Sequence, residues 1–309
     1  MPVYPKESSY LEFQQLLTAS SQSITTRGLA LFASDPQKYS QLAVLPFSAY
    51  IAALAEDLKT PEFSALLASA RLLFGESARN LAPSELELLR QLFFDCTWRA
   101  ASAQSWFPQE GGHADRVARN AAALAAQLGC SDLEVGEIYW GGLLHDIGKV
   151  FVGELFVALA DQGLAIETTM PFIRTHASLG RDFLESVLPL FSIPLVCAAQ
   201  HQESVDGSGY PDGLRFEQLT IPGQIANIAD GYDATVTRLG WSASQICADI
   251  QSMYARAGHP HAPIVQAFIQ LVEEKHPEWY LSPFQQNGLK QLPLLKREEP
   301  VLSRAKELG

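Results

Sequence analysis

Apolar residues recur at intervals of three and four along almost the whole chain of 309 residues. Segments such as SYLEFQQLL near the start and PIVQAFIQLVEE near the end carry this spacing, which places apolar side chains on one face of a helix. The strict alternation typical of half-buried strands is absent from the sequence. The pattern therefore predicts an all-α protein.

The character of the sequence changes at the segment FPQEGG, which begins at Phe107. Residues 1–105 contain helical patterns but no Gly-rich phosphate loop and no convergent polar residues, so we expect an N-terminal helical domain that serves packing or sensing. Residues 106–280 contain helical patterns that carry histidines, and we expect a second helical domain there. Prolines among polar residues predict a C-terminal tail over residues 281–309.

The charge balance limits the partners that the protein can have. Net charge is −12, from 34 acidic and 22 basic residues, so we expect no affinity for a nucleic acid polymer or an anionic membrane surface. The cysteines form no CxxC pair and the chain starts without a secretory signal, which predicts reduced thiols in a cytoplasmic protein. The longest uncharged stretches contain proline and fall short of the roughly 20 apolar residues that a membrane span needs.

Five polar positions in the second half of the chain are regularly spaced. Successive groups are separated by 32, 30, 25 and 29 residues. Each interval has about the length of a helix, a loop and part of the next helix, so we expect each group on its own helix. Helices packed around one centre can aim such side chains inward, as in the metal sites of bundle cores. The positions are His113, the pair His145-Asp146, His176, His201 and Asp230.

Imidazoles and carboxylates together are ligands for hard or borderline cations. We expect two divalent metal ions, with iron or manganese favoured and nickel or zinc as alternatives. A carboxylate can bridge two ions, and Asp146, next to His145, is the candidate bridge. Lys149 follows Asp146 by three residues, which on a helix places its side chain on the same face, near a metal-bound anion.

Five motifs in a fixed order point to one family. They are GGHADRV, LLHDIGK, THASLG, HQESVDGSGYPDGL and IADGYDA. In this order they resemble the HD-GYP domain of the HD superfamily of metal-dependent phosphohydrolases. The resemblance covers residues 106–275 and leaves residues 1–105 outside it. It implies an HD-superfamily helical bundle, here an HD-GYP-like catalytic domain, with an additional N-terminal helical domain.

HD-GYP proteins are bacterial phosphodiesterases that open cyclic di-GMP to the linear dinucleotide pGpG and often continue to GMP, so the resemblance implies this activity. By motif, the first ion would be bound by His113, His145, Asp146 and Asp230, and the second by Asp146, His176 and His201. Two ions about 3.5–4 Å apart can hold a hydroxide for in-line attack on phosphorus and neutralise the developing charge.

The resemblance also implies residues that contact the substrate. Lys149 and Tyr210 match such positions, and Arg238 is the candidate for a phosphate contact after IADGYDA. Gly209 belongs to the segment DGSGYP, whose glycines permit turns that other residues avoid. Lys149 could stabilise a phosphoryl oxygen or help to protonate the leaving group, which makes Asp146 and Lys149 the candidate catalytic residues.

Four positions depart from the family pattern. The family usually has a second histidine where this chain has Gln200, and often a glutamate where it has Gln109. Groups of this kind hold a third ion in some members, so we predict a centre of two ions. The family usually has an arginine where this chain has Gln224. It also has a second basic residue that contacts phosphate, and at the matching position, near Trp241, this chain has no base.

These departures leave two alternatives to a cyclic di-GMP phosphodiesterase. One is a cyclic-dinucleotide receptor with little or no turnover, which signals as a homodimer or to a partner through residues 1–105. The other is a phosphohydrolase that acts on another nucleotide. Turnover, binding without turnover, or activity only on other phosphoesters would distinguish the three.

Overall fold

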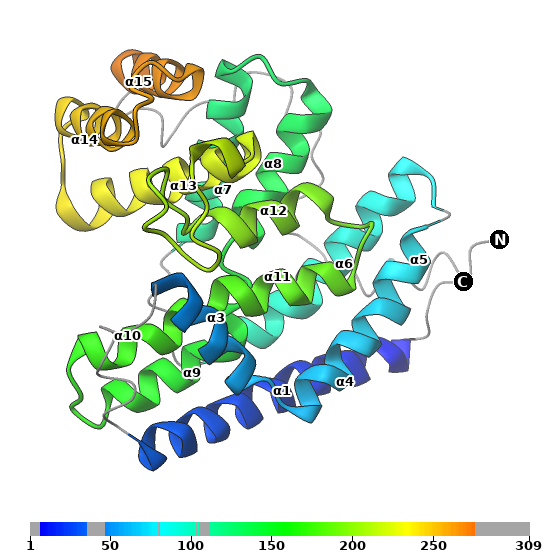
Figure 1. Cartoon of the computed structure of the whole chain (residues 1–309). Coiled ribbons are helices and arrows are strands. Elements are labelled where there is room, and N and C mark those ends of the chain that lie inside the picture. The colour runs from blue at the N-terminus through cyan, green and yellow to red at the C-terminus, as the bar shows by residue number, and fades with distance from the viewer. Residues whose placement is uncertain (1–6, 36–46, 80, 103, 105–111, 276–309) are drawn as a thin grey trace.

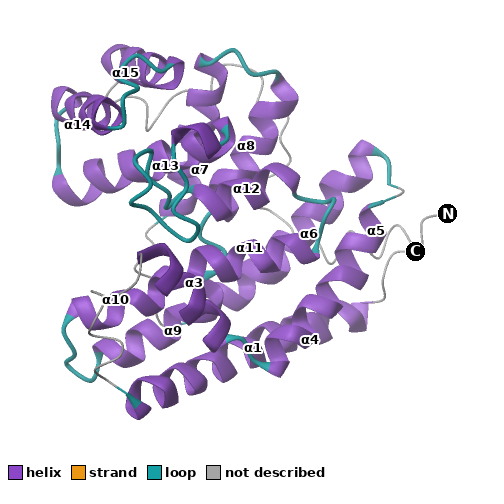
Figure 2. Cartoon of the chain, in the orientation of Figure 1, coloured by secondary structure: helices purple, strands orange, loops and turns teal. Residues whose placement is uncertain are grey.

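The computed structural model describes residues 7–35, 47–79, 81–102, 104 and 112–275. The predicted tail and Gln109 lie outside them. Within the described ranges the chain consists of helices joined by turns and loops and forms no β-strand (Figure 2), so the prediction of an all-α protein is confirmed. The boundary near residue 105 stays a prediction, because residues 105–111 lie outside the described part.

The described residues before residue 105 form five α-helices and one short π-helical segment. They are α1 (Glu7–Ser34), α3 (Phe47–Leu58), α4 (Pro61–Ala70), η1 (Arg71–Gly75), α5 (Glu76–Ala78) and α6 (Pro83–Ser102). The remaining helices follow after residue 112. They are α7 (His113–Gln127), α8 (Asp132–Leu144), α9 (Lys149–Ala160), α10 (Ile166–Arg174), α11 (His176–Ser186), α12 (Ser192–Gln200), η3 (Phe216–Gln218), α13 (Ile221–Ala234), η4 (Thr235–Leu239), α14 (Ala243–Arg256) and α15 (Pro263–Lys275).

Local capping sets the start of α8, which leads to His145, and of α13, which contains Asp230. At α8, the Ser131 hydroxyl accepts a hydrogen bond from the Glu134 amide, and the Glu134 carboxylate accepts one from the Ser131 amide at 2.8 Å. At α13, the Thr220 hydroxyl accepts a hydrogen bond from the Gly223 amide at 3.1 Å. These caps satisfy backbone donors that the first helical turn leaves unpaired, and so favour one helix start over its neighbours.

The N-terminal helices and the histidine-bearing helices share one hydrophobic core. Phe13 of α1, Phe93 of α6 and Phe183 of α11 are fully buried, and their ring centroids lie 5.3–6.4 Å apart. Helix α1 runs along α9 (Figure 1), and the contact is so close that a Cβ atom on Gly28 would lie 2.3 Å from the Leu155 side chain. Since burying one such aromatic side chain contributes roughly 1.5–3 kcal/mol, this core ties the two parts of the chain together.

A second hydrophobic cluster lies under α14 and α15, at the upper left of Figure 1. Tyr232 of α13 and Phe268 of α15 meet there with ring centroids 6.0 Å apart. The two clusters adjoin where α7 crosses α8, because a Cβ atom on Gly142 would lie only 2.4 Å from the Cα atom of Ala118. This close helix crossing brings the start of α7 near the end of α8.

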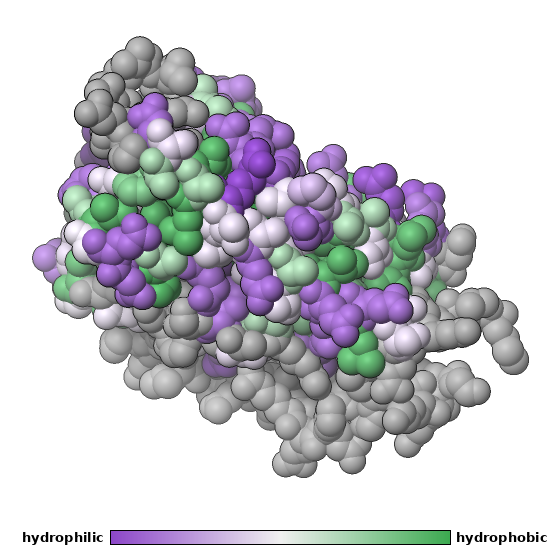
Figure 3. All heavy atoms as spheres, turned by 90° about the horizontal axis from the view of Figure 1, so that it is seen from below, coloured by the Kyte–Doolittle hydropathy of each residue, from purple (hydrophilic) through white to green (hydrophobic). Residues whose placement is uncertain are grey.

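Across the residues that the structure describes, each helix is too short or too polar to cross a membrane. The underside of the molecule (Figure 3) interleaves polar and apolar residues on its described surface. Large apolar side chains that are exposed, such as Leu72 at 70% and Leu133 at 75%, come from separate helices. Such single exposures are ordinary for a water-facing surface.

Candidate metal centre

The six predicted ligand residues converge at one point in the fold, mostly from helix ends. His113 is the first residue of α7 and His176 is the first residue of α11. Asp230 alone lies inside a helix, in α13. The expectation that each group lies on its own helix holds for His113, His176 and Asp230, which belong to α7, α11 and α13. It is wrong for the other groups, which follow the ends of α8 and α12.

His145, Asp146 and His201 occupy turns. His145 caps the end of α8, Asp146 follows it in the turn before α9, and His201 caps the end of α12. The turn after Asp146 lies directly on α11, because a Cβ atom on Gly148 would lie 1.9 Å from the carbonyl oxygen of His176. Glycine is thus required for this approach, which brings Asp146 next to His176.

The Asp146 carboxylate occupies the middle of the cluster. Its Oδ1 atom lies 3.0 Å from His176 Nε2 and 3.4 Å from His201 Nε2. Its Oδ2 atom lies 3.2 Å from His145 Nε2 and 3.7 Å from His113 Nε2. Each oxygen faces a different pair of imidazoles, so one carboxylate could serve two cations at once.

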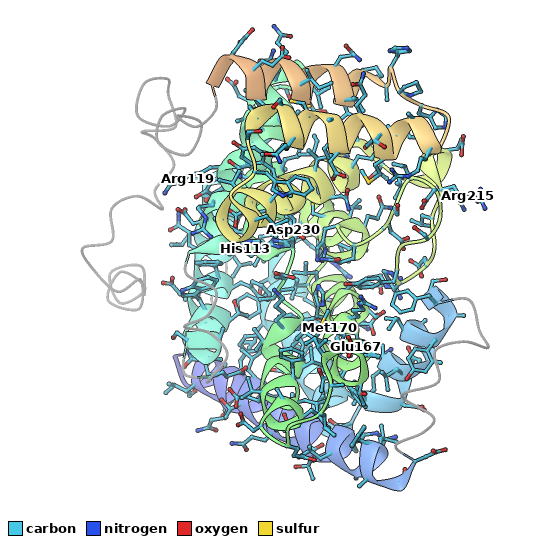
Figure 4. The ribbon with its side chains drawn as sticks, turned by 90° about the vertical axis from the view of Figure 1, so that its left-hand side faces the viewer. His113, Arg119, Glu167, Met170, Arg215 and Asp230 are labelled. Atoms are coloured by element: carbon cyan, nitrogen blue, oxygen red, sulfur yellow. The ribbon has the colours of Figure 1, made fainter. Side chains whose placement is uncertain are left out.

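Asp230 completes one side of the cluster, and Figure 4 shows it beside His113 near the middle of the molecule. Its Oδ1 atom lies 3.2 Å from His113 Nε2 and 3.9 Å from His145 Nε2. The ligand atoms of these three residues all lie within 4.8 Å of one another, and the same is true of His145, Asp146 and His201.

Hydrogen bonds to backbone carbonyls orient three of the imidazoles. The Nδ1 atoms of His145, His176 and His201 lie 2.7, 2.7 and 3.0 Å from the carbonyl oxygens of Gly142, Ile173 and Ala198. A carbonyl only accepts, so each Nδ1 carries the hydrogen and each Nε2 turns its lone pair toward the cluster. This tautomer is the one that metal-binding histidines need.

In this tautomer the Nε2 atoms of His145, His176 and His201 carry no hydrogen, so these three atoms cannot donate to one another. His176 Nε2 and His201 Nε2 lie 3.1 Å apart with their lone pairs facing each other, an arrangement that a cation between them stabilises. Within the described residues, His145 Nε2 and Asp146 Oδ1 are buried without a hydrogen-bond partner. Buried polar atoms of this kind are costly unless something satisfies them, so the donor set fits divalent metal ions.

The electrostatics of the cluster favour positive charge. Burial opposes the charged form of His113, but hydrogen bonds to Asp146, Asp230 and Asp233 outweigh it and raise its pKa to about 11. Burial alone would raise the pKa of Asp146, but the charges of His145 and Lys149 hold it well below its usual value. The centre therefore keeps its carboxylates ionised in a buried place, which suits a cation.

Two residues behind His113, Asp233 and Arg116, support it, and the sequence did not predict their role. The Asp233 carboxylate accepts a hydrogen bond from His113 Nδ1 at 2.7 Å, and Arg116 donates to its Oδ1 and Oδ2 atoms at 2.7 and 3.1 Å. A carboxylate behind an imidazole fixes the ring and increases its basicity. The available signal was the spacing: Arg116 follows His113, and Asp233 follows Asp230, by three residues.

The variant Asp233→Asn should lower the affinity for Mn²⁺ by about 10–100-fold, the usual effect of losing a carboxylate behind a ligand histidine. The side chain keeps its shape but no longer supplies the negative charge that His113 and Arg116 contact. Calorimetric titration with Mn²⁺ measures the change, and Asp249→Asn, an exposed position on α14, is the matched control. Equal affinity in both variants would show that Asp233 does not support the centre.

The DGSGYP segment is held in place by Glu203, whose role the sequence did not reveal. This buried carboxylate accepts hydrogen bonds from the amides of Asp212, Gly213 and Leu214 at 2.7, 3.2 and 2.9 Å. Gly209 is required by its surroundings, since a Cβ atom there would lie 2.2 Å from the Ser204 nitrogen. We call residues 203–214 the Tyr210 loop.

The predicted substrate residues are brought to the cluster in two cases. Lys149 Nζ lies 2.5 Å from Asp146 Oδ2, although Asp146 lies in the turn before α9 and not on a shared helix face as the spacing argument assumed. The Tyr210 amide donates a hydrogen bond to the carbonyl of Gln202, whose side chain donates one to Asp230 Oδ2 at 3.2 Å, so the loop contacts the cluster next to Tyr210. Burial raises the pKa of the Tyr210 phenol, the charge of Arg174 lowers it, and the charges of Asp146 and Asp230 raise it. Arg238 lies in η4, and its side chain is outside the described part.

Two of the departures from the family pattern have structural roles away from the centre. The Gln200 side-chain oxygen accepts hydrogen bonds from the Thr220 amide and hydroxyl at 3.0 and 2.9 Å, and so ties α12 to the start of α13. Gln224 is buried, and its side-chain oxygen accepts a hydrogen bond from the Tyr254 hydroxyl at 3.0 Å. Trp241 packs against the second hydrophobic cluster.

Comparison with known proteins finds relatives of the part of the chain that contains the cluster. The HD domain family matches residues 101–261, just over half of the chain. A cyclic di-GMP phosphodiesterase of Thermotoga maritima is 30% identical over 167 residues, which are 52% of this chain and 44% of that protein.

Two further relatives carry related names. The cyclic di-GMP phosphodiesterase response regulator RpfG of Xanthomonas campestris is 31% identical over 151 residues, 48% of this chain and 39% of that protein. The 3′3′-cGAMP-specific phosphodiesterase 3 of Vibrio cholerae is 31% identical over 161 residues, 50% of this chain and 34% of that protein. The matches span less than half the length of each of these three relatives.

Proposed function

Because the chain belongs to the HD domain family, and to the HD-GYP group that its motifs predicted, we propose that it is a metal-dependent phosphodiesterase of cyclic dinucleotides, with cyclic di-GMP as the preferred substrate. The observation that carries the proposal is the Asp146 carboxylate, whose two oxygens face two pairs of imidazoles. The catalytic part is residues 106–280.

The proposed ligands divide into two groups around Asp146. One group takes His113, His145 and Asp230 with Asp146 Oδ2, and the other takes His176 and His201 with Asp146 Oδ1. Two divalent ions bound there, iron or manganese, would supply the charge and the acidified water that hydrolysis of a phosphodiester needs. Gln200 stands where the family usually has a second histidine, and its side chain is hydrogen-bonded to Thr220, which supports a centre of two ions and not three.

The remaining polar groups bind and orient the substrate. The Lys149 ammonium lies beside Asp146 Oδ2. From there it can stabilise the negative charge that develops on the phosphoryl oxygens, or give a proton to the leaving oxygen. Tyr210 presents an aromatic ring beside the centre, on which a guanine can stack. Arg238 is proposed as a phosphate contact from η4.

The test is an anaerobic turnover assay. Protein loaded with Fe²⁺ or Mn²⁺ is mixed with cyclic di-GMP, and the products are separated by chromatography. Formation of pGpG or GMP by the wild type, and its absence in His145→Ala, is the expected result. No product with any of these metals would refute the phosphodiesterase, and binding without turnover would identify a receptor that signals through residues 1–105.

A second substrate, 3′3′-cGAMP, is included in the same assay because a relative carries that name. Higher kcat/KM for 3′3′-cGAMP than for cyclic di-GMP would reverse the proposed preference but keep the reaction type. Hydrolysis of other phosphoesters alone would favour a phosphohydrolase of another nucleotide.

A further inference from the structure

An arginine outside every predicted set of site residues lies beside the candidate centre. Arg174 is the last residue of α10, two positions before His176. Its guanidinium carbon lies 4.7 Å from the ring centroid of Phe47 and 5.8 Å from that of Tyr210. The two rings meet edge to face, with centroids 5.8 Å apart. An arginine, an N-terminal helix and the Tyr210 loop therefore meet at one place.

The Arg174 guanidinium is half-buried, and no carboxylate within the described part of the chain pairs with it. Two other arginines differ in this respect: Arg116 is bound to Asp233, and Arg181 pairs with Asp212 at 2.8 Å. Stacking on two aromatic rings and a hydrogen bond to the Tyr210 side chain hold the guanidinium in place, and a guanidinium has five N–H groups, so further donors remain at its edge. Those groups suit the oxygens of a phosphate, which a guanidinium can bind with two parallel hydrogen bonds.

Tyr210 links this arginine to the candidate metal centre. Burial raises the pKa of the phenol most, the charge of Arg174 lowers it, and the charges of Asp146 and Asp230 raise it. The Tyr210 amide donates a hydrogen bond to the Gln202 carbonyl at 3.1 Å, and the Gln202 side chain donates one to Asp230 Oδ2 at 3.2 Å. The ring on which Arg174 stacks therefore belongs to a segment that contacts a proposed metal ligand.

Helix α3 is fixed where it meets the loop. It lies across α10 and α11 (Figure 1), and Lys59, just after its end, pairs with Asp182 of α11 at 2.7 Å. At its start, Ser48 lies against the Tyr210 loop, since a Cβ atom on Gly213 would be 2.9 Å from the Ser48 hydroxyl. Phe47 is therefore held against Arg174 before any ligand binds.

A cyclic dinucleotide carries two phosphodiester groups, and the metal centre can take only one at a time. The positions where the family has further basic residues do not supply the second contact here, because Gln224 is buried on Tyr254 and Trp241 is not basic. Arg174 is stacked on the ring of Tyr210 and has no carboxylate partner among the described residues, so it can supply the positive charge and the N–H donors that the second phosphodiester group needs.

We propose that Arg174 binds the second phosphodiester group of the cyclic dinucleotide, and that Phe47 of the N-terminal helices completes this subsite. The proposal rests on the proposed function for the identity of the ligand. It makes α3 a wall of the substrate site, so the N-terminal part of the chain takes part in recognition.

The test compares the metal-loaded full-length chain with the variants Arg174→Ala, Arg174→Lys and Arg181→Ala. We expect Arg174→Ala to raise KM for cyclic di-GMP by about tenfold to hundredfold while kcat stays within about threefold, the effect of losing a charge-assisted hydrogen bond to bound substrate. Lysine should restore only part of the affinity, because it lacks the paired donors of the guanidinium. Metal content should equal that of the wild type.

Arg181→Ala measures what a looser Tyr210 loop costs by itself, because Arg181 anchors that loop through Asp212. An equal rise of KM in the Arg174 and Arg181 variants would overturn the proposal, since Arg174 would then only anchor the loop. Loss of metal from Arg174→Ala would also overturn it, because the residue would then act through His176.

Binding of cyclic di-GMP, measured by calorimetry on the same proteins, separates this inference from the proposed function. A wild type that binds without turnover refutes the phosphodiesterase, yet weaker binding by Arg174→Ala alone still supports the subsite. Equal binding by wild type and Arg174→Ala overturns the subsite, whether or not the wild type has turnover. A wild type that neither binds nor hydrolyses the dinucleotide overturns both.

Discussion

Asp146→Ala is expected to lose both metal ions and to lower the rate of cyclic di-GMP hydrolysis by at least about 10³-fold, as when one member of a concerted catalytic group is removed. The reason is the central position of the carboxylate. Its Oδ1 atom faces His176 and His201, while its Oδ2 atom faces His145 and His113. Removal of one side chain therefore takes a ligand from both ions.

Metal content after desalting, measured by mass spectrometry, tests this expectation directly. Asp146→Asn keeps the shape of the side chain but not its charge, and should also lose metal, because an amide is a weaker ligand than a carboxylate. Asp249→Ala, on the exposed face of α14, is the control. Two ions retained by Asp146→Ala would refute the bridging role, and one retained ion would assign Asp146 to a single site.

Lys149→Ala is expected to lower kcat by about 10²–10³-fold with both ions in place, the scale on which the loss of one electrostatic contact to the transition state acts. The Lys149 ammonium lies 2.5 Å from Asp146 Oδ2 and is 18% exposed, so its charge acts in a largely buried place. KM should change less than kcat, since this charge matters most where negative charge develops on phosphorus.

Lys149→Arg is the matched variant for this prediction, because it keeps the positive charge on a longer side chain. Partial recovery of kcat would support an electrostatic role, whereas failure to recover would indicate that Lys149 transfers a proton. Unchanged kcat in Lys149→Ala would show that the lysine only pairs with Asp146 and takes no part in the reaction.

The fold class could be predicted from the spacing of apolar residues, because a helical repeat is a local property of the sequence. The meeting of His113, His145, His176 and His201 could also be predicted, since their motifs occur in the order and at the intervals of a known family. That they lie at helix ends could not, because capping and close contacts such as that of Gly148 decide where each helix stops.

The supporting residues were beyond prediction for a different reason. Arg116 and Asp233 are separated by 117 residues, and Phe47 and Tyr210 are still farther apart in sequence. The spacing of three residues that puts Arg116 and Asp233 on the face of a proposed ligand recurs on every helix, so it does not by itself single these residues out. Their roles arise only from tertiary packing, which a single sequence does not reveal.

The aromatic core that joins Phe13, Phe93 and Phe183 has a consequence for how such a protein can change over evolution. The helices before residue 105 cannot be replaced as a unit by an unrelated domain, because the new domain would have to pack equally well against α11. Recombination at this boundary is therefore penalised, and change must proceed by small matched substitutions on both sides. Phe183 follows His176 by seven residues on the same helix, so a substitution that changes the packing of Phe183 can also shift a proposed metal ligand.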